Sequence, residues 1–291
     1  MDLEIRGVSK TYSNGVKALG GVDLTIGKGM FGLLGPNGAG KSSVMRTIAT
    51  LQDPDTGSIM FGDMNVLTEK QEFRRILGYL PQDFGVYADA SAVDLLDYFA
   101  RLKGVSDAKE RKQHVDYLLD VVNLTKAKNI NVDTFSGGMR QRFGIAQTLI
   151  GNPKVIIVDE PTAGLDPAER NRFYGILHRI GDEAVVILST HIVGDVTNLC
   201  KNMAILAGGE IQALGTPNQL VTQIDGQLWQ KNVAREQLAE FRNKHKVIST
   251  RLFDGEVQAI VQASSCPGVG FEGKVADLED LYFTYVPKLA V

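Results

Sequence analysis

The eight residues "GPNGAGKS", from Gly35 to Ser42, decide the fold. Their glycines, lysine and serine have the spacing of a P-loop, a turn whose backbone N–H groups surround phosphate oxygens. The apolar run "MFGLL" precedes the turn and "SSVMRTIATL" follows it, which predicts the buried strand and the helix that a P-loop joins. We expect Lys41 to contact the terminal phosphates and the Ser42 hydroxyl to ligate Mg²⁺. The residues expected to bind the nucleotide at this turn are Gly35, Pro36, Asn37, Gly38, Ala39, Gly40, Lys41, Ser42 and Ser43.

Two longer apolar runs extend the prediction from this turn to a sheet. "KVIIVD" ends at Asp159 and "AVVILST" ends at Thr190, and both are continuously apolar, as strands covered on both faces are. Three N-terminal stretches, "LEIRGV", "GVDLTI" and "GSIMFG", instead alternate apolar and polar residues and predict strands with one exposed face. The expected fold class is therefore α/β, a P-loop NTPase with a mostly parallel core sheet and an N-terminal antiparallel β subdomain.

The hydrophobic period changes in two further regions. "SAVDLLDYFARLKG", with Ser91 as its cap and Gly104 as its stop, and "HVDYLLDVV" have helical spacing. They predict an inserted helical subdomain at about residues 83–150. Beyond residue 225, a strand-like "GQLWQKN", a polar helix and two runs joined by an Asp-Gly pair predict a small C-terminal α+β domain, residues 225–291.

Two carboxylates, Asp159 and Glu160, follow the run "VIIVD" at the carboxyl end of the predicted strand. Open α/β sheets bind their ligands at this edge. Asp159 is expected to hold Mg²⁺, and Glu160 to polarise a water molecule for attack on the terminal phosphate. Without the P-loop, two carboxylates after a strand would more often begin a turn or a helix.

Two more polar side chains close predicted strands, His191 after "VVILST" and Gln82 in "ILGYLPQD". His191 could donate to the terminal phosphate or hold the attacking water, although a single histidine is more often structural. Gln82 could touch Mg²⁺ and water. If the four strands are parallel neighbours, these groups converge with the P-loop on one nucleotide-hydrolysing site, which we expect to use Lys41, Gln82, Glu160 and His191 in catalysis.

The remaining residues of these types have simpler interpretations. Tyr12, in "SKTYSNG", is either a surface-turn tyrosine or a platform on which adenine stacks. Cys200 and Cys266 are far apart, and we expect both to be buried apolar residues. The histidines at positions 114, 178 and 245 lie in polar helical stretches, where solvated faces are the expected environment.

Taken in order, the motifs GPNGAGKS, Gln82, FSGGM, VIIVDE, "AGLD" and His191 resemble those of the nucleotide-binding subunit of an ABC transporter. The resemblance covers about residues 1–220, the expected ATP-binding domain. It implies that Ser136, Gly137 and Gly138 form the signature motif and that Asp166 lies in the D-loop. It also implies that Gln82 lies in the Q-loop and that Tyr12 stacks on adenine. Ser136 and Asp166 are in addition expected to cap helices.

The signature motif departs from the family pattern at two positions. Phe135 replaces the usual leucine and Met139 the usual glutamine. A methionine side chain cannot donate the amide contact, whereas the backbone N–H groups of Gly137 and Gly138 are unaffected. The resemblance implies that ATP is bound between two copies arranged head to tail, with the P-loop of one copy and the Ser136 helix start of the other on the same nucleotide.

The resemblance also implies partners. "FSGGMRQR" and "KVADLEDLYFTYV" resemble exporter-type subunits, which pair with separately encoded membrane permeases. The partners would be a second copy, or a paralogous ATPase subunit, and a permease whose short cytoplasmic helix docks on the stretch from Asp83 to Gly104. Alternatives are a soluble non-transport ABC ATPase acting on ribosomes or DNA, and an importer subunit.

Composition limits the remaining possibilities. The chain has 291 residues, of which 44% are hydrophobic and 22% charged, and its net charge is -3. No basic stripe indicates nucleic-acid binding, and the start "MDLEIRGVSK" has no apolar signal-peptide segment. No apolar run approaches the roughly 18 residues of a membrane span. The expected location is cytoplasmic, peripheral on the cytoplasmic face of the inner or plasma membrane through the permease.

Overall fold

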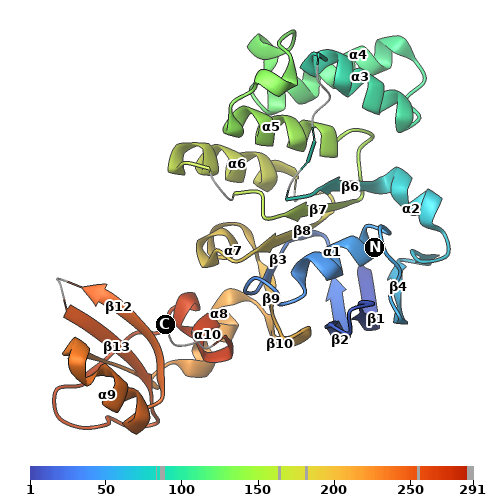
Figure 1. Cartoon of the computed structure of the whole chain (residues 1–291). Coiled ribbons are helices and arrows are strands. Elements are labelled where there is room, and N and C mark those ends of the chain that lie inside the picture. The colour runs from blue at the N-terminus through green and yellow to red at the C-terminus, as the bar shows by residue number, and fades with distance from the viewer. Residues whose placement is uncertain (83, 86–88, 163–164, 181–182, 254–255, 287–291) are drawn as a thin grey trace.

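The computed structural model describes the chain except for residues 83, 86–88, 163–164, 181–182, 254–255 and 287–291. The chain forms a six-stranded sheet, which lies at the centre of the molecule in Figure 1. Its strands, in spatial order, are β10 (Glu210–Gly215), β9 (Asn202–Ala207), β3 (Gly29–Leu34), β8 (Val185–Thr190), β7 (Val155–Asp159) and β6 (Leu77–Leu80). All neighbours pair in parallel except β10, which forms an antiparallel hairpin with β9. The predicted mostly parallel core sheet is therefore confirmed.

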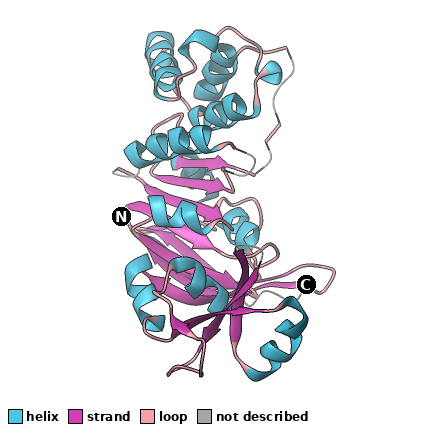
Figure 2. Ribbon diagram, turned by 90° about the vertical axis from the view of Figure 1, so that its left-hand side faces the viewer, coloured by secondary structure: helices cyan, strands magenta, loops and turns pink. Residues whose placement is uncertain are grey.

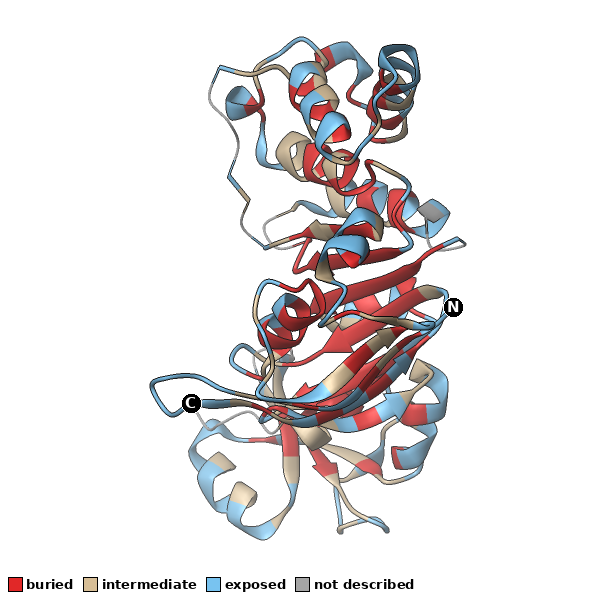
Figure 3. Ribbon diagram, turned by 90° about the vertical axis from the view of Figure 1, so that its right-hand side faces the viewer, coloured by how far each residue is buried: buried red, intermediate tan, exposed pale blue. Residues whose placement is uncertain are grey.

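Both faces of the parallel part of this sheet are covered, so β7 and β8 are entirely buried, whereas the edge strand β10 is largely exposed (Figure 3). Along β7, Val155 and Ile157 pack with one apolar core, and Ile156 and Val158 pack with another. The first core also contains the antiparallel sheet and its helices, and the second contains helices of the opposite face. The elements of the first are β2 (Lys17–Ile26), β1 (Leu3–Thr11), β4 (Thr56–Phe61), β5 (Met64–Asn65), α1 (Lys41–Ile48) and α2 (Lys70–Ile76). The helices of the second that lie at the central sheet are α5 (Gly137–Thr148), α6 (Pro167–Ile180) and α7 (Val193–Leu199), and the same core extends into the helical block and the C-terminal part of the chain.

A helical block stands beyond β6 and forms the top of the molecule in Figures 1 and 2. It contains α3 (Ala92–Leu102), α4 (Ala108–Val121), the 3₁₀ turns η1 (Thr125–Ala127) and η2 (Val132–Thr134), and α5. The start of α3 follows from the predicted cap, because Ser91 Oγ accepts the N–H of Asp94 at 3.3 Å. Gly104 follows the helix with a φ of 88°, a conformation that favours glycine.

The C-terminal part contains a second, four-stranded antiparallel sheet in the order β12-β13-β11-β14. Its elements are α8 (Pro217–Val221), η3 (Thr222–Ile224), β11 (Leu228–Val233), η4 (Arg235–Gln237), α9 (Leu238–Lys244), β12 (Val247–Phe253), β13 (Glu256–Gln262), β14 (Glu272–Gly273) and α10 (Leu278–Tyr285). The predicted hairpin is β12 and β13, but the Asp-Gly pair at 254–255 lies outside the described residues. The last helix, α10, packs against α7, α8 and β9 as well as β12, so this part shares a core with the central sheet. The boundary at residues 220–225 stays a prediction.

Three side chains lie in environments that differ from the expected ones. Cys200 is buried as predicted, but Cys266 is exposed. His114 is half-buried, and its Nε2 accepts the N–H of Gly151 at 3.3 Å. His245 is half-buried, and its ring packs against Phe241 and Phe271. The sequence does not reveal these environments because two of them depend on contacts with distant segments. Within the described residues, no helix combines the length and apolarity of a bilayer span.

Candidate functional site

The P-loop connects β3 to α1 and depends on glycine for its close packing. The Gly35 N–H donates to the Thr190 carbonyl at 3.3 Å, which joins the loop to the end of β8. A Cβ atom at Gly35 would lie 2.4 Å from the Leu206 carbonyl oxygen, and one at Gly40 would lie 2.5 Å from the Ala18 carbonyl oxygen. Gly40 also has a φ of 106°, a backbone conformation that L side chains rarely adopt. The glycines therefore let the loop pass close to two neighbouring backbones.

Lys41 begins α1, and its ammonium group points back into the loop, where it is 5% exposed. It donates to the carbonyl oxygens of Gly35 at 2.7 Å and Pro36 at 3.1 Å, and lies 3.2 Å from Glu160 Oε1. An ammonium group has three N–H donors, so these three acceptors can use all of them. The lysine is held at the place where the loop would surround a phosphate.

Glu160 follows β7 with a φ of 47°, in the left-handed region, and its N–H donates to the Ser189 carbonyl at 2.9 Å. A non-glycine residue held in this region costs roughly 1–3 kcal/mol, and such residues often lie at functional sites. The side chain is 8% exposed, and its Oε2 lies 3.0 Å from His191 Nδ1. One carboxylate therefore bridges Lys41 and His191, which the sequence places in separate motifs.

Asp159, the last residue of β7, is 3% exposed, and its Oδ1 has no hydrogen-bond partner among the described residues. Burial raises the pKa of this carboxyl group, and the nearby hydroxyls of Ser189 and Ser42 partly lower it. A buried, unpaired carboxylate oxygen beside a serine hydroxyl is the donor set that suits a divalent cation. Within the described part of the chain no cluster of three or more acidic, histidine or cysteine side chains could hold a metal alone, so Mg²⁺ would need phosphate and water oxygens as further ligands.

Gln82 and Tyr12 lie at the margin of this cluster. Gln82 is exposed two residues after β6, the neighbour of β7, and makes no hydrogen bond with the residues that the structure describes. The Tyr12 hydroxyl lies 2.9 Å from Ser43 Oγ and donates to Gln52 Oε1 at 3.1 Å. The ring is therefore anchored to α1 at its hydroxyl end while its side chain is 36% exposed.

The signature residues lie apart from this cluster, at the start of α5. Ser136 Oγ accepts the N–H of Met139 at 3.3 Å, so Ser136 is the N-cap of the helix and is exposed. Phe135 is buried and packs edge-on against Phe143, and the half-buried Met139 packs against the same core. Because α5 and α1 contribute to the cores on opposite faces of the central sheet, the two helix starts lie on different sides of it.

Asp166 is the N-cap of α6, where its Oδ1 accepts the Glu169 N–H at 2.8 Å. The residues before it at 163–164, part of "AGLD", lie outside the described residues. Sequence reasoning missed the ion pair that fixes α6 against α5, in which Arg142 Nε lies 3.3 Å from Glu169 Oε2. Gly138 permits this approach, since a Cβ atom there would lie 3.0 Å from the Glu169 carboxyl group. No local signal joins two residues this far apart in the chain.

Comparisons with known proteins agree with this geometry. A family model described as "ABC transporter" matches residues 19–163. The uncharacterized ABC transporter ATP-binding protein YxlF of Bacillus subtilis (strain 168) is 32% identical over 269 residues, which cover 87% of this chain and 89% of YxlF. The daunorubicin/doxorubicin resistance ATP-binding protein DrrA of Streptomyces peucetius is 32% identical over 267 residues, 91% of this chain and 78% of DrrA. The ABC transporter A family member 8 of Dictyostelium discoideum is 37% identical over 226 residues, but the chain spans only 27% of its length.

Solved structures of ABC transporter cassettes also match this chain. The dimeric structure of a bacterial ABC transporter cassette matches with a TM-score of 0.68 at 25% identity, over 74% of this chain and 98% of that one. The same cassette in a post-hydrolysis state, bound to ADP and Pi, matches equally well.

Proposed function

Because the chain belongs to the ABC transporter family, as an ATP-binding subunit that hydrolyses ATP, we propose that two copies close head to tail on two ATP molecules and drive a separate membrane permease. The observation that carries this proposal is that the buried Glu160 contacts both the buried Lys41 and the exposed His191, while Ser136 caps a helix on the other side of the sheet. Each copy then supplies the P-loop to one nucleotide and the signature helix to the other.

In this arrangement the P-loop N–H groups and Lys41 bind the phosphates, and Tyr12 stacks on the adenine. Asp159 and the Ser42 hydroxyl are the ligands that fit Mg²⁺, with Gln82 as a further candidate; the cation would neutralise charge on the phosphates. Glu160 orients and deprotonates the attacking water, and His191 donates to the terminal phosphate. Catalysis then depends on positioning and electrostatic stabilisation, because the protein makes no covalent bond to the phosphoryl group.

The position of the signature helix supports the dimer. Ser136 and Gly137 are exposed and Gly138 is half-buried at this helix start, whose backbone N–H groups suit an anion. Within the described residues, no hydrogen bond or ion pair joins these three residues to the P-loop. Asp166 and Ser136 lie at the starts of adjacent helices, α6 and α5, which the Arg142–Glu169 ion pair holds together. A partner's ATP is the anion that these groups would meet across a two-fold interface.

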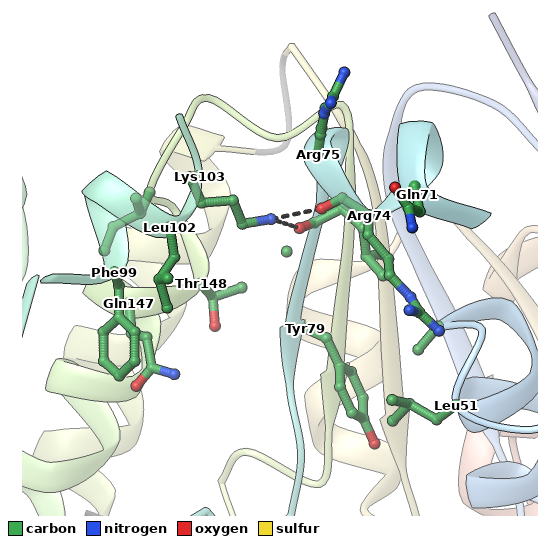
Figure 4. Close-up of a pocket in the computed structure, with 14 residues that line it drawn as sticks. Leu51, Gln71, Arg74, Arg75, Tyr79, Phe99, Leu102, Lys103, Gln147 and Thr148 are labelled. Carbon is green, nitrogen blue, oxygen red and sulfur yellow. Dashed lines mark hydrogen bonds between the residues drawn. The ribbon is translucent and has the colours of Figure 1, made fainter. Parts of the chain in front are cut away.

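A groove of about 560 Å³ between the central sheet and the helical block supports the docking of a permease (Figure 4). Two exposed leucines lie on its walls, Leu51 after α1 and Leu102 at the end of α3, with exposed fractions of 55% and 66%. Arg74 and Arg75 line it on α2. This surface fits a short amphipathic helix with an apolar face and an acidic residue, which is the chemistry of helix-in-groove recognition.

Lys103 crosses the groove and ties its two walls together (Figure 4). Its ammonium group, at the end of α3, donates to the carbonyl oxygens of Arg74 at 2.8 Å and Leu77 at 2.6 Å. Burial lowers the pKa of Lys103. A helix inserted at this groove would therefore act on a contact between the helical block and the sheet, where a movement caused by ATP could be transmitted.

We propose export as the direction of transport and the cytoplasmic face of the membrane as the location. DrrA, named for drug resistance, supports export because its similarity extends over most of both chains. The alternative of an ATPase acting on ribosomes or DNA has no support among these relatives. Mg²⁺, the second copy and the permease are likewise proposals for this chain.

The concentration dependence of hydrolysis tests the proposal. Turnover per chain should rise with protein concentration and saturate, because only a dimer contains complete sites. Analytical ultracentrifugation of Glu160→Gln with ATP should show the dimer that carries this activity. Full turnover by a chain that stays monomeric at all concentrations would refute the head-to-tail site.

Crosslinking in membranes tests the permease interface. A cysteine at Leu102 should crosslink to a membrane protein in an ATP-dependent manner, and a cysteine at Tyr117, exposed on α4, should not. Cys266 must be changed to serine first because it is exposed, whereas burial raises the pKa of Cys200 to about 12 and keeps it unreactive. Phe84 is a poorer site because its ring lies against Gly144, and Tyr87 lies outside the described residues.

A further inference from the structure

Helix α7 carries a fully buried carboxylate, Asp195, to which no role has been assigned above. Its Oδ2 accepts the hydroxyl of Thr162 at 2.6 Å and the hydroxyl of Thr190 at 2.8 Å. Its Oδ1 accepts the hydroxyl of Tyr174. Burying a carboxylate is costly unless hydrogen bonds replace its hydration, and three hydroxyl donors do so here.

The three donors come from three segments of the proposed catalytic site. Thr190 ends β8 and directly precedes His191, and its hydroxyl also accepts the Ile192 N–H at 3.0 Å. Its carbonyl oxygen accepts the N–H of Gly35, the first residue of the P-loop. Asp195 therefore holds the backbone on both sides of the histidine.

The other two donors connect the carboxylate to Glu160 and to α6. Thr162 lies two residues after Glu160, on the segment that leaves β7. Tyr174 lies on α6, the helix that Asp166 caps. One buried side chain thus joins the loops of Glu160 and His191 to the helix that begins at the proposed dimer interface.

We propose that Asp195 is a positioning residue that fixes Glu160 and His191 relative to each other and couples both to α6. This inference rests on the proposed function, because it assumes that the two side chains act on ATP. Their contact of 3.0 Å joins the ends of two separate strands, and an error of about 1 Å in such a geometry can lower a rate by about 10²-fold.

Apolar packing, rather than Asp195, attaches α7 to the sheet. A Cβ atom at Gly32 on β3 would lie 3.0 Å from both methyl groups of Val196 and 3.1 Å from the Cys200 sulfur, so the helix lies directly against the strand. Val196 and Leu199 belong to the same apolar core as Leu281 on α10. A variant at Asp195 should therefore keep α7 in place while freeing the two loops.

Steady-state hydrolysis tests the proposal. Asp195→Ala should lower kcat by about 10- to 100-fold and leave the KM for ATP within about threefold, because the P-loop and Tyr12 still bind the nucleotide. Asp195→Asn should recover part of kcat, since its amide oxygen still accepts a hydroxyl. Thr197→Ala, on the exposed face of the same helix, is the matched control and should have wild-type kcat.

A double-mutant cycle with His191→Ala separates positioning from simple stability. If Asp195 acts through the histidine, its removal should lower kcat much less in the His191→Ala background than in the wild type. Additive losses, or a kcat for folded Asp195→Ala within twofold of the wild type, would overturn the proposal.

Tyr174→Phe decides the matter if Asp195→Ala does not fold, because it removes only one hydroxyl. It should lower kcat about two- to fivefold, a change of about 0.4–1 kcal/mol in the barrier. The effect should again be smaller in the His191→Ala background. An unchanged kcat would overturn the proposal. The proposed function fails by a different result, namely a wild-type chain that does not hydrolyse ATP or does so as a monomer.

Discussion

Lys41 Nζ lies 3.2 Å from Glu160 Oε1, and both side chains are buried. The residue assigned to the terminal phosphates is thus paired with the residue assigned to the attacking water. An approaching phosphate would compete with Glu160 for the lysine. In the proposed mechanism, a phosphate that takes over Lys41 would leave the carboxylate available for water, so nucleotide binding itself would prepare the base.

Glu160→Gln should lower kcat by about 10²–10⁴-fold, because the amide cannot accept the water's proton. ATP affinity should be equal to or higher than that of the wild type, since the neutral amide competes less with phosphate for Lys41. Rapid-mix hydrolysis and equilibrium nucleotide binding measure the two effects. Hydrolysis near the wild-type rate would contradict the assignment of the base.

Asp159→Asn should stabilise the fold while it abolishes metal-dependent hydrolysis. Burial raises the pKa of Asp159, which means that the folded chain favours the protonated carboxyl group. At neutral pH the charged carboxylate therefore lowers the stability of the fold. The asparagine should raise the melting temperature by about 1–3 °C. Loss of the metal ligand should lower kcat by at least about 10²-fold, since a bound cation supplies several kcal/mol of charge stabilisation.

Calorimetry with and without Mg²⁺ and ATP checks this prediction. The wild type should gain thermal stability from the two ligands together, and Asp159→Asn should gain less. Asp133→Asn, an exposed carboxylate before the signature motif, is the control for removal of one charge. A destabilised Asp159→Asn protein with normal hydrolysis would exclude the metal role.

The central sheet could be predicted because its pattern is local. "VIIVD" and "VVILST" are apolar at every position but their ends, and both proved to be buried on two faces. The convergence of the P-loop, Glu160 and His191 followed from strands that end at one edge. The docking of α10 on α7 could not be predicted, because its apolar residues fit a small separate domain equally well.

The site was predictable in its residue types but not in its contacts. The motifs give Lys41, Glu160 and His191, yet only the fold shows that the Glu160 carboxylate contacts both of the other side chains. The buried position of Asp195 could not be predicted, because a lone acidic residue on a short helix is usually solvated. Its three hydroxyl donors are 33, 21 and 5 residues away in the chain. Buried polar networks depend on tertiary packing, which a single sequence does not display.

His114 should make stability fall as the pH drops below neutrality. Burial holds the pKa of His114 below its usual value of 6.5. Between the folded-state pKa and 6.5 the unfolded chain binds more protons, so stability falls as the pH decreases through this window. Protonation of Nε2 also removes the acceptor for the Gly151 N–H.

Thermal unfolding at several pH values compares the wild type with His114→Gln, whose amide oxygen can accept the same N–H. Between about pH 7.5 and about pH 5 the wild type should lose more stability than the variant. His178→Gln, at an exposed position on α6, is the matched control and should follow the wild type. Parallel curves for the wild type and His114→Gln would contradict the assigned environment.

Tyr12→Ala should weaken ATP binding by about 5- to 150-fold, because stacking of a base on an aromatic ring contributes roughly 1–3 kcal/mol. Tyr12→Phe keeps the ring but loses the anchors to Ser43 and Gln52, so its loss should be smaller. Fluorescence titration with a labelled nucleotide measures both variants. Equal losses for alanine and phenylalanine would assign the effect to the anchor and not to the ring.

Two inactive variants should restore each other's activity if ATP is bound between copies. Lys41→Ala removes a P-loop contact and Ser136→Arg blocks the signature helix start, and each protein alone should hydrolyse ATP poorly. A mixed dimer contains one site in which both defects meet and one in which neither occurs. An equal mixture should therefore recover up to about a quarter of the wild-type rate, because about half of the dimers are mixed and each has one intact site. Full activity of Ser136→Arg alone, or no recovery in a mixture shown to exchange subunits, would mean that the signature helix of one copy does not complete the P-loop site of the other.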